Sequence, residues 1–440
     1  MNVLTLAWTV TIEALSWIEL KRVSEDTALR RAARQLDVED EAASREAGAL
    51  VYGVMSRLNT LDHVIEDSLK PNYLGNLSLG VRSFLRLYAY IFHFGSGFAE
   101  AYALHDHAKE VLGESAFSAV NEAVELIPRQ DLCFSGFELE KRLAYKYSHP
   151  EWYVRYLLKE FGEKETKRML EPVEVPVYLR LNTLRDISQT VEGIRGQGFR
   201  LEKDRSIDHV YRVEDPTGLT SLPEYQRGEF IIQDRASVLA GVVAAPAHGE
   251  LVLDVCAAPG IKTSHLAQLM GNRGRIISVD SSMRRLRSFE GIMERLGVEI
   301  AKPFLGDART VGGLPSVEAD MVLVDPPCTG SGNFFSEPSS RWRLSGRSIS
   351  RMADLQYRIL CSAAHRVARG GRLVYSTCSV TVEENEGVVN AFLDENPDFV
   401  AVEAAPRIGE PGLRGLYEAQ RLYPHLHDCN GFFIAKMVRT

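Results

Sequence analysis

Two cysteines stand in turns where a thiol could act as a nucleophile. Cys328 lies in Asp-Pro-Pro-Cys-Thr-Gly-Ser-Gly, residues 325–332, which follows an apolar run typical of a buried strand. The two prolines stiffen this turn, and the glycines open the loop after it. Cys378 lies in Tyr-Ser-Thr-Cys-Ser, residues 375–379, again after an apolar run. Free cysteines usually pack in a core, but the polar, glycine-rich surroundings of Cys328 disfavour that interpretation.

Three aspartates also follow predicted strands. Asp280 ends an apolar run, Asp307 follows a glycine, and Asp325 opens the first cysteine turn. An acid at the first of these positions could accept hydrogen bonds from both hydroxyls of a ribose, or it could simply cap the helix that follows. Asp307 could accept from the amino group of an adenine, or it could be a turn aspartate. The sequence predicts a nucleoside site without deciding between these roles.

A loop of small residues follows the apolar run 251–255 and leads into a helix. Its glycine lets the backbone approach a ligand closely, and the free N–H groups of the helix N-terminus suit a carboxylate. The methionine moiety of S-adenosylmethionine carries such a carboxylate, so we expect this cofactor. Taken alone, the loop could also be a tight turn with no ligand. Its residues are Cys256, Ala257, Ala258, Pro259, Gly260, Ile261 and Lys262.

These loops can meet only if the strands before them lie in one sheet. From residue 237 onward, short apolar runs alternate with stretches of helical periodicity, which predicts an α/β, doubly wound, Rossmann-like sheet. Ligands bind beyond the carboxyl ends of the strands in such sheets. A helical face over residues 352–367 is expected to end at Gly370 and Gly371, a natural C-terminal cap.

Three domains are expected along the chain. Residues 1–148 show helical spacing and no strand pattern. Residues 149–235 predict a small α+β subdomain, with a helix from Glu151 to a stop at Gly162. Residues 236–440 form the Rossmann-like domain.

Composition bounds the function classes. The 440 residues carry a net charge of −8, with 45% hydrophobic and 25% charged residues, which are ordinary globular values. The negative net charge does not suit a protein that coats nucleic acid non-specifically, although an enzyme that binds RNA in a groove needs only a local basic surface. Six cysteines form no Cys-x-x-Cys pair, so no metal is expected. Glu13 interrupts the apolar start, so we expect a cytoplasmic protein with no signal peptide and no membrane span.

A thiolate beside a methyl donor suits methylation of a pyrimidine. Cytosine C5 is a poor nucleophile, but addition of a thiolate to C6 makes C5 electron-rich. The C5 proton must then leave and the thiolate must be eliminated. A free thiol with a pKa of about 8.5 is only a few per cent ionised at neutral pH, so the site should be locally electropositive.

Five motifs, in this order, resemble the Sun-type (Fmu/RsmB-like) RNA cytosine-C5 methyltransferases. They are LDVCAAPGIKT, VDSS, GDAR, VDPPCTGSG and VYSTCS. Residues 179–183, 421–425 and 431–435 also resemble this family. The helical N-terminal region resembles the NusB-like RNA-binding domain of the RsmB branch.

The resemblance implies roles for individual residues. Ribosomal RNA is the favoured substrate through the NusB-like likeness, transfer RNA stays open, and protein partners are unknown. Ile261 departs from the second glycine of the family. The segment 333–338 also departs, since it lacks a basic residue found in many relatives. The resemblance implies that the backbone of 256–262 binds the methionine end of the cofactor, that Asp280 binds its ribose and that Asp307 binds its adenine. It also implies that Asp325 lies near the methyl group and the target base, that Cys378 is the nucleophile and that Cys328 assists release of the product.

Other interpretations compete with these roles. DNA cytosine methyltransferases place their nucleophile in a Pro-Cys turn, which would favour Cys328, and the predicted geometry cannot rank the two thiols. Enzymes that methylate amino groups use a DPPY or NPPY turn, whereas this turn reads DPPC. A non-catalytic RNA-binding or ribosome-assembly factor would leave the cysteine pair unexplained.

A basic, aromatic cluster follows the first cysteine turn. It suits phosphate contacts and base stacking, or it is a charged surface beside a helix. Its residues are Arg341, Trp342, Arg343 and Arg347.

Overall fold

The computed structural model describes residues 2–95 and 97–440 and divides into two compact units. One unit comprises Met1–Pro172 with Phe334–Arg343, and the other comprises Val173–Asn333 with Leu344–Thr440. This division differs from the three predicted domains. The helix after residue 150 packs with its predecessor in the first unit, and the small sheet belongs to the second unit.

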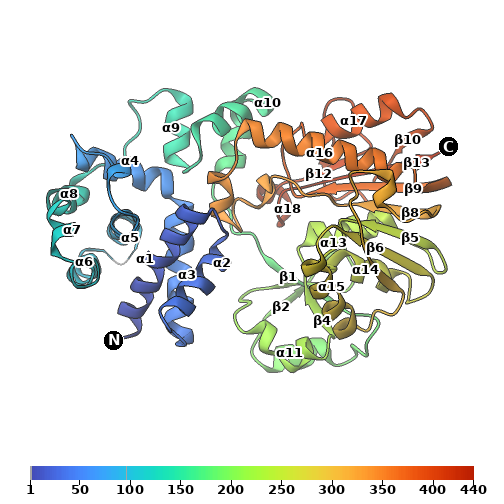
Figure 1. Cartoon of the computed structure of the whole chain (residues 1–440), viewed down its shortest axis with the longest axis horizontal. Coiled ribbons are helices and arrows are strands. Elements are labelled where there is room, and N and C mark those ends of the chain that lie inside the picture. The colour runs from blue at the N-terminus through green and yellow to red at the C-terminus, as the bar shows by residue number, and fades with distance from the viewer. Residues whose placement is uncertain (1, 96) are drawn as a thin grey trace. The chain divides into compact units, whose positions relative to one another are not determined.

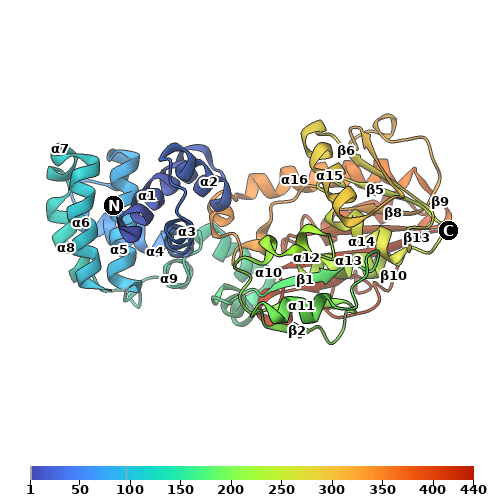
Figure 2. The same ribbon diagram turned by 90° about the horizontal axis from the view of Figure 1, so that it is seen from below.

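The first unit is helical, and its described residues up to Pro172 contain no strand. Helix α1 packs against α2, α3 and α5 around one hydrophobic core, and Figures 1 and 2 show these helices as a bundle. Gly162 has a non-helical backbone with φ 74°, so it interrupts helix α10 at the predicted position. The longer helices are α1 (Val3–Lys21), α2 (Glu25–Gln35), α3 (Glu41–Ser56), α4 (Leu58–Leu69), α5 (Leu79–Phe94), α6 (Phe98–Leu112), α9 (Leu139–Lys146) and α10 (Glu151–Leu170).

Helix α1 is, among the described residues, the one helix long and apolar enough to cross a membrane by length and composition. Trp8, Leu15 and Ile18 of this helix are buried in the core of the helical unit. A core helix passes the same test as a membrane span, so the feature is weak evidence for a span.

The segment Phe334–Arg343 returns to the helical unit from the middle of the chain. Arg341 is only 2% exposed and donates a 2.9 Å hydrogen bond to the Ser148 carbonyl. Trp342 donates through its indole N–H to the Met55 carbonyl over 3.1 Å. These two side chains therefore serve packing, which corrects the RNA-contact interpretation for them. The sequence could not reveal this, because the partners are backbone carbonyls about 190 and 290 residues away.

A small antiparallel sheet with the order β2-β3-β1-β4 opens the second unit. Asn182, just after β1, donates to the carbonyls of Gly228 and Leu296, each over 2.7 Å, and so joins this sheet to helix α15 (Met283–Leu296). Of these four strands, the sequence predicted only β1 and β4. The strands are β1 (Val177–Leu181), β2 (Leu201–Lys203), β3 (Val210–Val213) and β4 (Phe230–Ile232).

The main sheet has the order β11-β12-β13-β9-β8-β5-β6-β7, and β10 pairs with β13. The strands from β5 to β9 are parallel, whereas β10 to β13 are antiparallel. The strands are β5 (Leu251–Val255), β6 (Arg275–Asp280), β7 (Ala301–Leu305), β8 (Ala319–Val324), β9 (Val367–Thr377), β10 (Phe399–Val402), β11 (Glu410–Pro411), β12 (Gln420–Leu422) and β13 (Phe432–Arg439).

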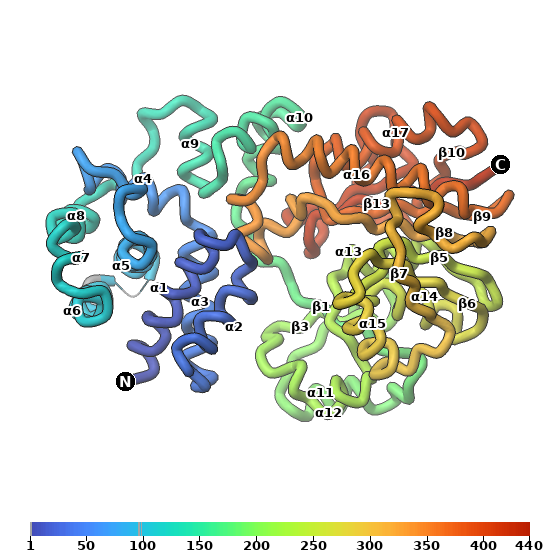
Figure 3. The backbone as a smooth tube through the Cα atoms, viewed as in Figure 1, coloured from blue at the N-terminus to red at the C-terminus, as the bar shows by residue number. Residues whose placement is uncertain are grey.

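Helices cover both faces of this sheet, which confirms the predicted Rossmann-like class (Figure 3). One difference concerns Gly370 and Gly371, because they lie inside β9 and the preceding helix ends earlier, at Ala364. Helices α13 (Arg235–Ala244), α14 (Ile261–Leu269) and α15 (Met283–Leu296) pack on one face, and α16 (Gly346–Ala364) and α17 (Glu386–Glu395) pack on the other.

Candidate active site

The candidate site lies where the strand order reverses. Strand β5 pairs with β6 on one side and with β8 on the other, so the loops after β5 and β8 diverge to opposite faces. A crevice at such a point is where open α/β sheets bind ligands. A cavity of about 340 Å³ lies here, and its lining includes Cys256, Asp280, Asp307, Leu355 and Ile359. The structure therefore brings together two of the three predicted acids, Asp280 and Asp307, with Cys256 of the predicted loop, whereas Asp325 does not line this cavity.

Asp280 is the most buried acid of this cavity, with 3% of its surface exposed. Its Oδ1 accepts from the backbone N–H of Ser282 over 2.9 Å. Its Oδ2 accepts no hydrogen bond from the described residues, although Arg285 lies 3.3 Å away as an ion-pair partner. A buried acceptor facing a cavity fits the hydroxyl of a ribose. The predicted cap role is not seen, because Ser282 caps the helix instead.

Asp307 lines the same cavity but is more exposed than Asp280. Its carboxylate pairs with Arg309, whose guanidinium donates to both oxygens at 2.6 to 3.0 Å. These hydrogen bonds lower the pKa of Asp307, so it is ionised and available as an acceptor. An adenine amino group would have to share this carboxylate with Arg309.

The glycine in the loop after β5 was predicted to let the backbone approach a ligand, but in the structure its neighbours are side chains of α15. A Cβ at Gly260 would come within 2.8 Å of Phe289 and of Met293, both from α15, and the φ of Gly260 is 106°. Glycine is therefore required here by close packing and a left-handed backbone. Ile261 is the first residue of α14 and packs against the core, which accounts for an apolar residue at this position.

Lys262 points from the start of α14 to the loop after β8. Its ammonium group donates to Asp325 Oδ2 over 2.8 Å, and Ser376 donates to Oδ1 of the same carboxylate over 2.9 Å. Burial alone would lower the pKa of Lys262, but Asp325, with smaller contributions from Cys378 and Asp254, raises it. A protonated lysine, paired with the Asp325 carboxylate, therefore lies at the cysteine turns.

The two cysteine turns meet at their thiols. Cys328 Sγ and Cys378 Sγ are 3.0 Å apart, and both residues are half-buried. The pKa of Cys328 lies well above its ordinary value, because it shares a hydrogen bond with Cys378, is buried, and lies near Glu384. Cys328 therefore stays protonated, within hydrogen-bonding distance of the sulfur of Cys378.

Glu384 is a buried acid at this site that the sequence reasoning missed. It is 0% exposed, and its carboxylate accepts hydrogen bonds from Thr329, Ser379, Thr381 and Gln356. The only sequence signal was an acid six residues after Cys378, in a run of three polar residues before a helix.

The remaining cysteines do not share this environment. Burial raises the pKa of Cys256 and of Cys429, so neither is a good nucleophile. Cys361 is half-buried in α16, whereas Cys133 is exposed. All six thiols are free, and no cluster of three or more candidate metal ligands occurs in residues 2–95 and 97–440.

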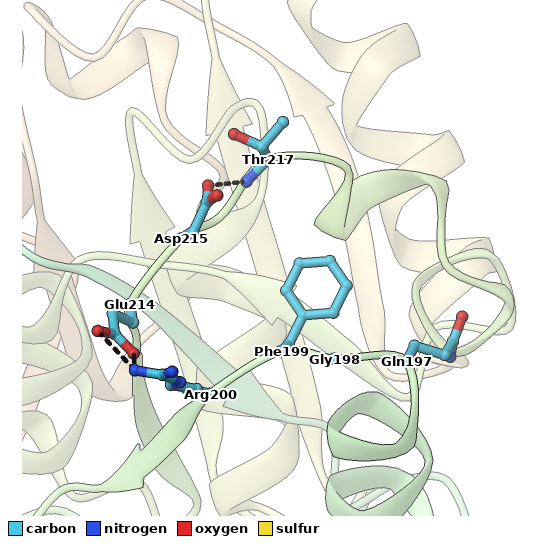
Figure 4. Close-up of a pocket in the computed structure, with 7 residues that line it drawn as sticks. All are labelled: Gln197, Gly198, Phe199, Arg200, Glu214, Asp215 and Thr217. Atoms are coloured by element: carbon cyan, nitrogen blue, oxygen red, sulfur yellow. Dashed lines mark hydrogen bonds and ion pairs between the residues drawn. The ribbon is translucent and has the colours of Figure 1, made fainter.

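A second pocket lies away from these loops, at the edge of the small sheet. Figure 4 shows Phe199 and an exposed ion pair between Arg200 and Glu214, while Asp215 accepts from the backbone of Thr217. These groups satisfy one another, and none is a buried nucleophile. The strand-end cavity is therefore the candidate active site.

Fold and site together define a methyltransferase of the Rossmann-like class. The family description "16S rRNA methyltransferase RsmB/F" matches residues 241–438. A probable ribosomal RNA small subunit methyltransferase B from Synechocystis is 30% identical over 403 residues, covering 89% of this chain and 90% of the relative. The chain belongs to the RsmB/F methyltransferase family. A relative of the same description from Bacillus subtilis is 29% identical over 441 residues, covering 97% of each chain.

Solved structures share the architecture. The crystal structure of PH0851 has a TM-score of 0.86 and 29% identity, covering 99% of each chain. The structure of NSun6 from Pyrococcus horikoshii with SFG has a TM-score of 0.60 and 27% identity, covering 66% of this chain and 98% of that chain. The larger coverage of the first includes the helical unit.

Proposed function

We propose that this protein is an RNA (cytosine-5-)-methyltransferase that uses S-adenosylmethionine and acts on ribosomal RNA. The observation that carries the proposal is the 3.0 Å approach of Cys328 and Cys378 beside a cavity lined by acids. Methylation of an amino group requires no such thiol pair. Membership of the RsmB/F family and the ribosomal RNA named for both bacterial relatives support the substrate class.

The residues at the cavity fit the proposed cofactor. The Oδ2 of Asp280, which accepts no hydrogen bond from the described residues, suits a ribose hydroxyl, Asp307 suits the adenine, and the backbone from Cys256 to Lys262 suits the methionine end. When bound, S-adenosylmethionine supplies an electrophilic methyl group on a sulfonium. The neighbour with SFG, an analogue of this cofactor, supports the assignment.

Cys378 is the proposed nucleophile. A target cytosine must first leave its stack. The Cys378 thiolate then forms a bond to C6, and the ring electrons move towards C5, which takes the methyl group. Loss of the C5 proton breaks the S–C6 bond and returns the electron pair to sulfur. Because Cys328 stays protonated beside Cys378, we assign Cys328 to product release.

Asp325 and Lys262 complete the proposed machinery. Lys262 is cationic and lies close enough to Cys378 to interact with it electrostatically, so we propose that its charge faces the sulfur that attacks the base. Asp325 is oriented by Lys262 and Ser376, and we propose that it lies against the target base and the methyl group. A carboxylate held by two donors keeps a fixed direction, which favours a single pose for the base.

The helical unit is proposed to be NusB-like and to bind RNA in the cytoplasm. The unit includes residues Phe334–Arg343, so deletion of residues 1–148 would leave that segment without its packing partners. Substitutions of exposed residues are therefore the sound test of RNA affinity. The exposed Arg347, just beyond this segment, remains a proposed RNA contact.

Bisulfite sequencing of total RNA from cells with and without the gene tests the proposed function. We expect one or a few cytosines of ribosomal RNA to resist conversion only when the gene is present. A complementation arm carrying Cys378→Ala should not restore resistance. Resistance in transfer RNA alone would correct the substrate, and identical conversion patterns in both cell lines would overturn the proposal.

A further inference from the structure

Glu384 connects the two cysteine turns through one buried carboxylate. On the Cys328 side, Thr329 donates to it through both its backbone N–H, over 2.8 Å, and its hydroxyl group. On the Cys378 side, the hydroxyl groups of Ser379 and Thr381 donate over 2.7 and 2.8 Å. The carboxylate thus accepts from the residue that follows each cysteine.

A third element holds the same carboxylate. Gln356 of α16 donates through its side-chain amide to Glu384 Oε2 and to the Pro327 carbonyl, each over 2.9 Å. Tyr375 of β9 donates to the backbone carbonyl of Glu384 over 2.6 Å. Helix, strand and both turns therefore converge on one residue.

The donors around this buried side chain suit a group that only accepts hydrogen bonds, as a carboxylate does. No Lys or Arg of the described residues forms an ion pair with Glu384, so five hydrogen-bond donors replace the lost water. Hydrogen bonds to a charged acceptor are about twice as strong as neutral ones. An amide in place of the carboxylate would turn its NH₂ group towards donors, leaving buried groups unsatisfied.

We propose that Glu384 is a positioning residue that holds the Cys328 and Cys378 turns against each other and thereby sets the distance between their thiols. Its catalytic consequence rests on the proposed function. Other bonds join the turns, notably from Gly332 N–H to the Cys378 carbonyl over 2.9 Å. A weaker one joins the Thr329 and Ser379 hydroxyl groups over 3.5 Å. Glu384 differs from these bonds in being an acid and in gathering donors from both turns and from α16. Its negative charge also favours the protonated form of Cys328.

The sharpest test measures the thiol pair without RNA or cofactor. Dibromobimane becomes fluorescent when both of its arms react, so the rate of fluorescence gain reports bridging of two adjacent thiols. We expect Glu384→Gln to slow bridging of Cys328 and Cys378 about tenfold, because at least one charge-assisted hydrogen bond is replaced by a clash of donors. The matched control is Glu383→Gln, an adjacent exposed acid, which should bridge at the wild-type rate.

Folding and activity are measured on the same variants. Glu384→Gln should keep its affinity for S-adenosylhomocysteine within twofold by calorimetry, since Glu384 does not line the cofactor cavity. Its single-turnover methylation of ribosomal RNA should fall about tenfold or more, in step with bridging. If this variant does not fold, the pair Thr329→Val with Thr381→Val removes one hydroxyl donor from each turn and must show the same loss of bridging.

The outcomes separate this inference from the proposed function. Bridging and turnover within twofold of wild type, in a folded Glu384→Gln protein or in the paired threonine variant, would overturn the positioning role. Loss of cofactor affinity in parallel with bridging would also overturn it, since the residue would then be only a general stabiliser. If the wild-type protein methylates no RNA while Glu384→Gln still loses bridging, the proposed function fails and the positioning role stands.

Discussion

Cys328 and Cys378 are 50 positions apart in the chain, yet their sulfur atoms lie 3.0 Å apart. Strand pairing explains the approach, because β8 and β9 are parallel neighbours and each cysteine follows the carboxyl end of one of them. The pair is asymmetric. Cys328 lies beside the Glu384 carboxylate and stays protonated, whereas Cys378 interacts with the Lys262 ammonium.

This asymmetry predicts different failures for the two cysteine variants. Cys378→Ala should form no covalent complex with RNA, since nothing adds to C6. Cys328→Ala should add and methylate but release slowly, so a covalent protein–RNA complex accumulates. Denaturing gels with labelled RNA distinguish the cases, and the exposed Cys133→Ala is the matched control. A complex trapped by Cys378→Ala and absent from Cys328→Ala would reverse the two roles.

The cofactor assignment predicts a graded loss of affinity. Asp280→Ala removes a buried acceptor and should weaken binding of S-adenosylmethionine about 10- to 100-fold, since a hydrogen bond to a charged group contributes about 1.5–3 kcal/mol. Asp307→Ala should cost less, because that carboxylate is more exposed and shared with Arg309. Calorimetry measures both. The exposed Asp394→Asn in α17 should bind normally, and unchanged affinity in both test variants would remove them from the site.

The sequence located the strand-end residues well and their surroundings poorly. Asp280, Asp307, Asp325 and the cysteine pair were found because a parallel sheet brings its carboxyl strand ends to one edge. Glu384 was missed because its partners are hydroxyl and amide groups, whose spacing has no recognisable pattern.

Long-range contacts also escaped the sequence. The role of Arg341 in the helical unit depends on carbonyl groups far away in the chain. The first compact unit extends to Pro172 and does not end near residue 148, because packing between helices, not composition, decides where a compact unit ends.

Two of the three arginines of the basic cluster, Arg341 and Arg347, should behave differently. Arg341→Ala should destabilise the helical unit by about 1–3 kcal/mol, because two buried carbonyls lose their donor. Arg347→Ala should leave the melting temperature unchanged but weaken RNA binding and reduce its salt dependence, since Arg347 is exposed. Thermal unfolding and filter binding over a salt series measure these effects. Normal stability of Arg341→Ala combined with weak RNA binding would restore the RNA-contact interpretation for Arg341.

Asp254 predicts a pH dependence of stability. It is buried in β5, accepts from the Thr263 hydroxyl over 2.5 Å, and burial raises its pKa to about 7. In the unfolded chain its pKa is about 3.9. Between these values the folded state binds more protons than the unfolded state, so stability falls as pH rises from about 4 to about 7 and is level above that.

The difference in unfolding free energy between wild type and Asp254→Asn isolates this contribution, because asparagine does not titrate. Urea unfolding at several pH values should show the difference declining by at most about 1.4 kcal/mol per pH unit inside this window. A difference that stays level from pH 4 to pH 7 would contradict the raised pKa.

Arg421 and Glu386 form an ion pair behind the Cys378 turn, with side chains 1% and 0% exposed. The guanidinium also donates to the Val380 carbonyl over 2.9 Å, so the pair holds the chain just after Cys378. Removal of one partner leaves a buried, unpaired charge, which typically costs about 3–5 kcal/mol. Arg421→Met and Glu386→Gln should each show such a loss in urea unfolding, while the double variant should lose clearly less than the sum.

The exposed pair Arg200 and Glu214, whose side chains are 81% and 62% exposed, provides the matched double-mutant cycle, and its coupling energy should be less than about 1 kcal/mol. Strict additivity in the buried cycle would show that Arg421 and Glu386 act independently and that their pairing does not hold the chain after Cys378.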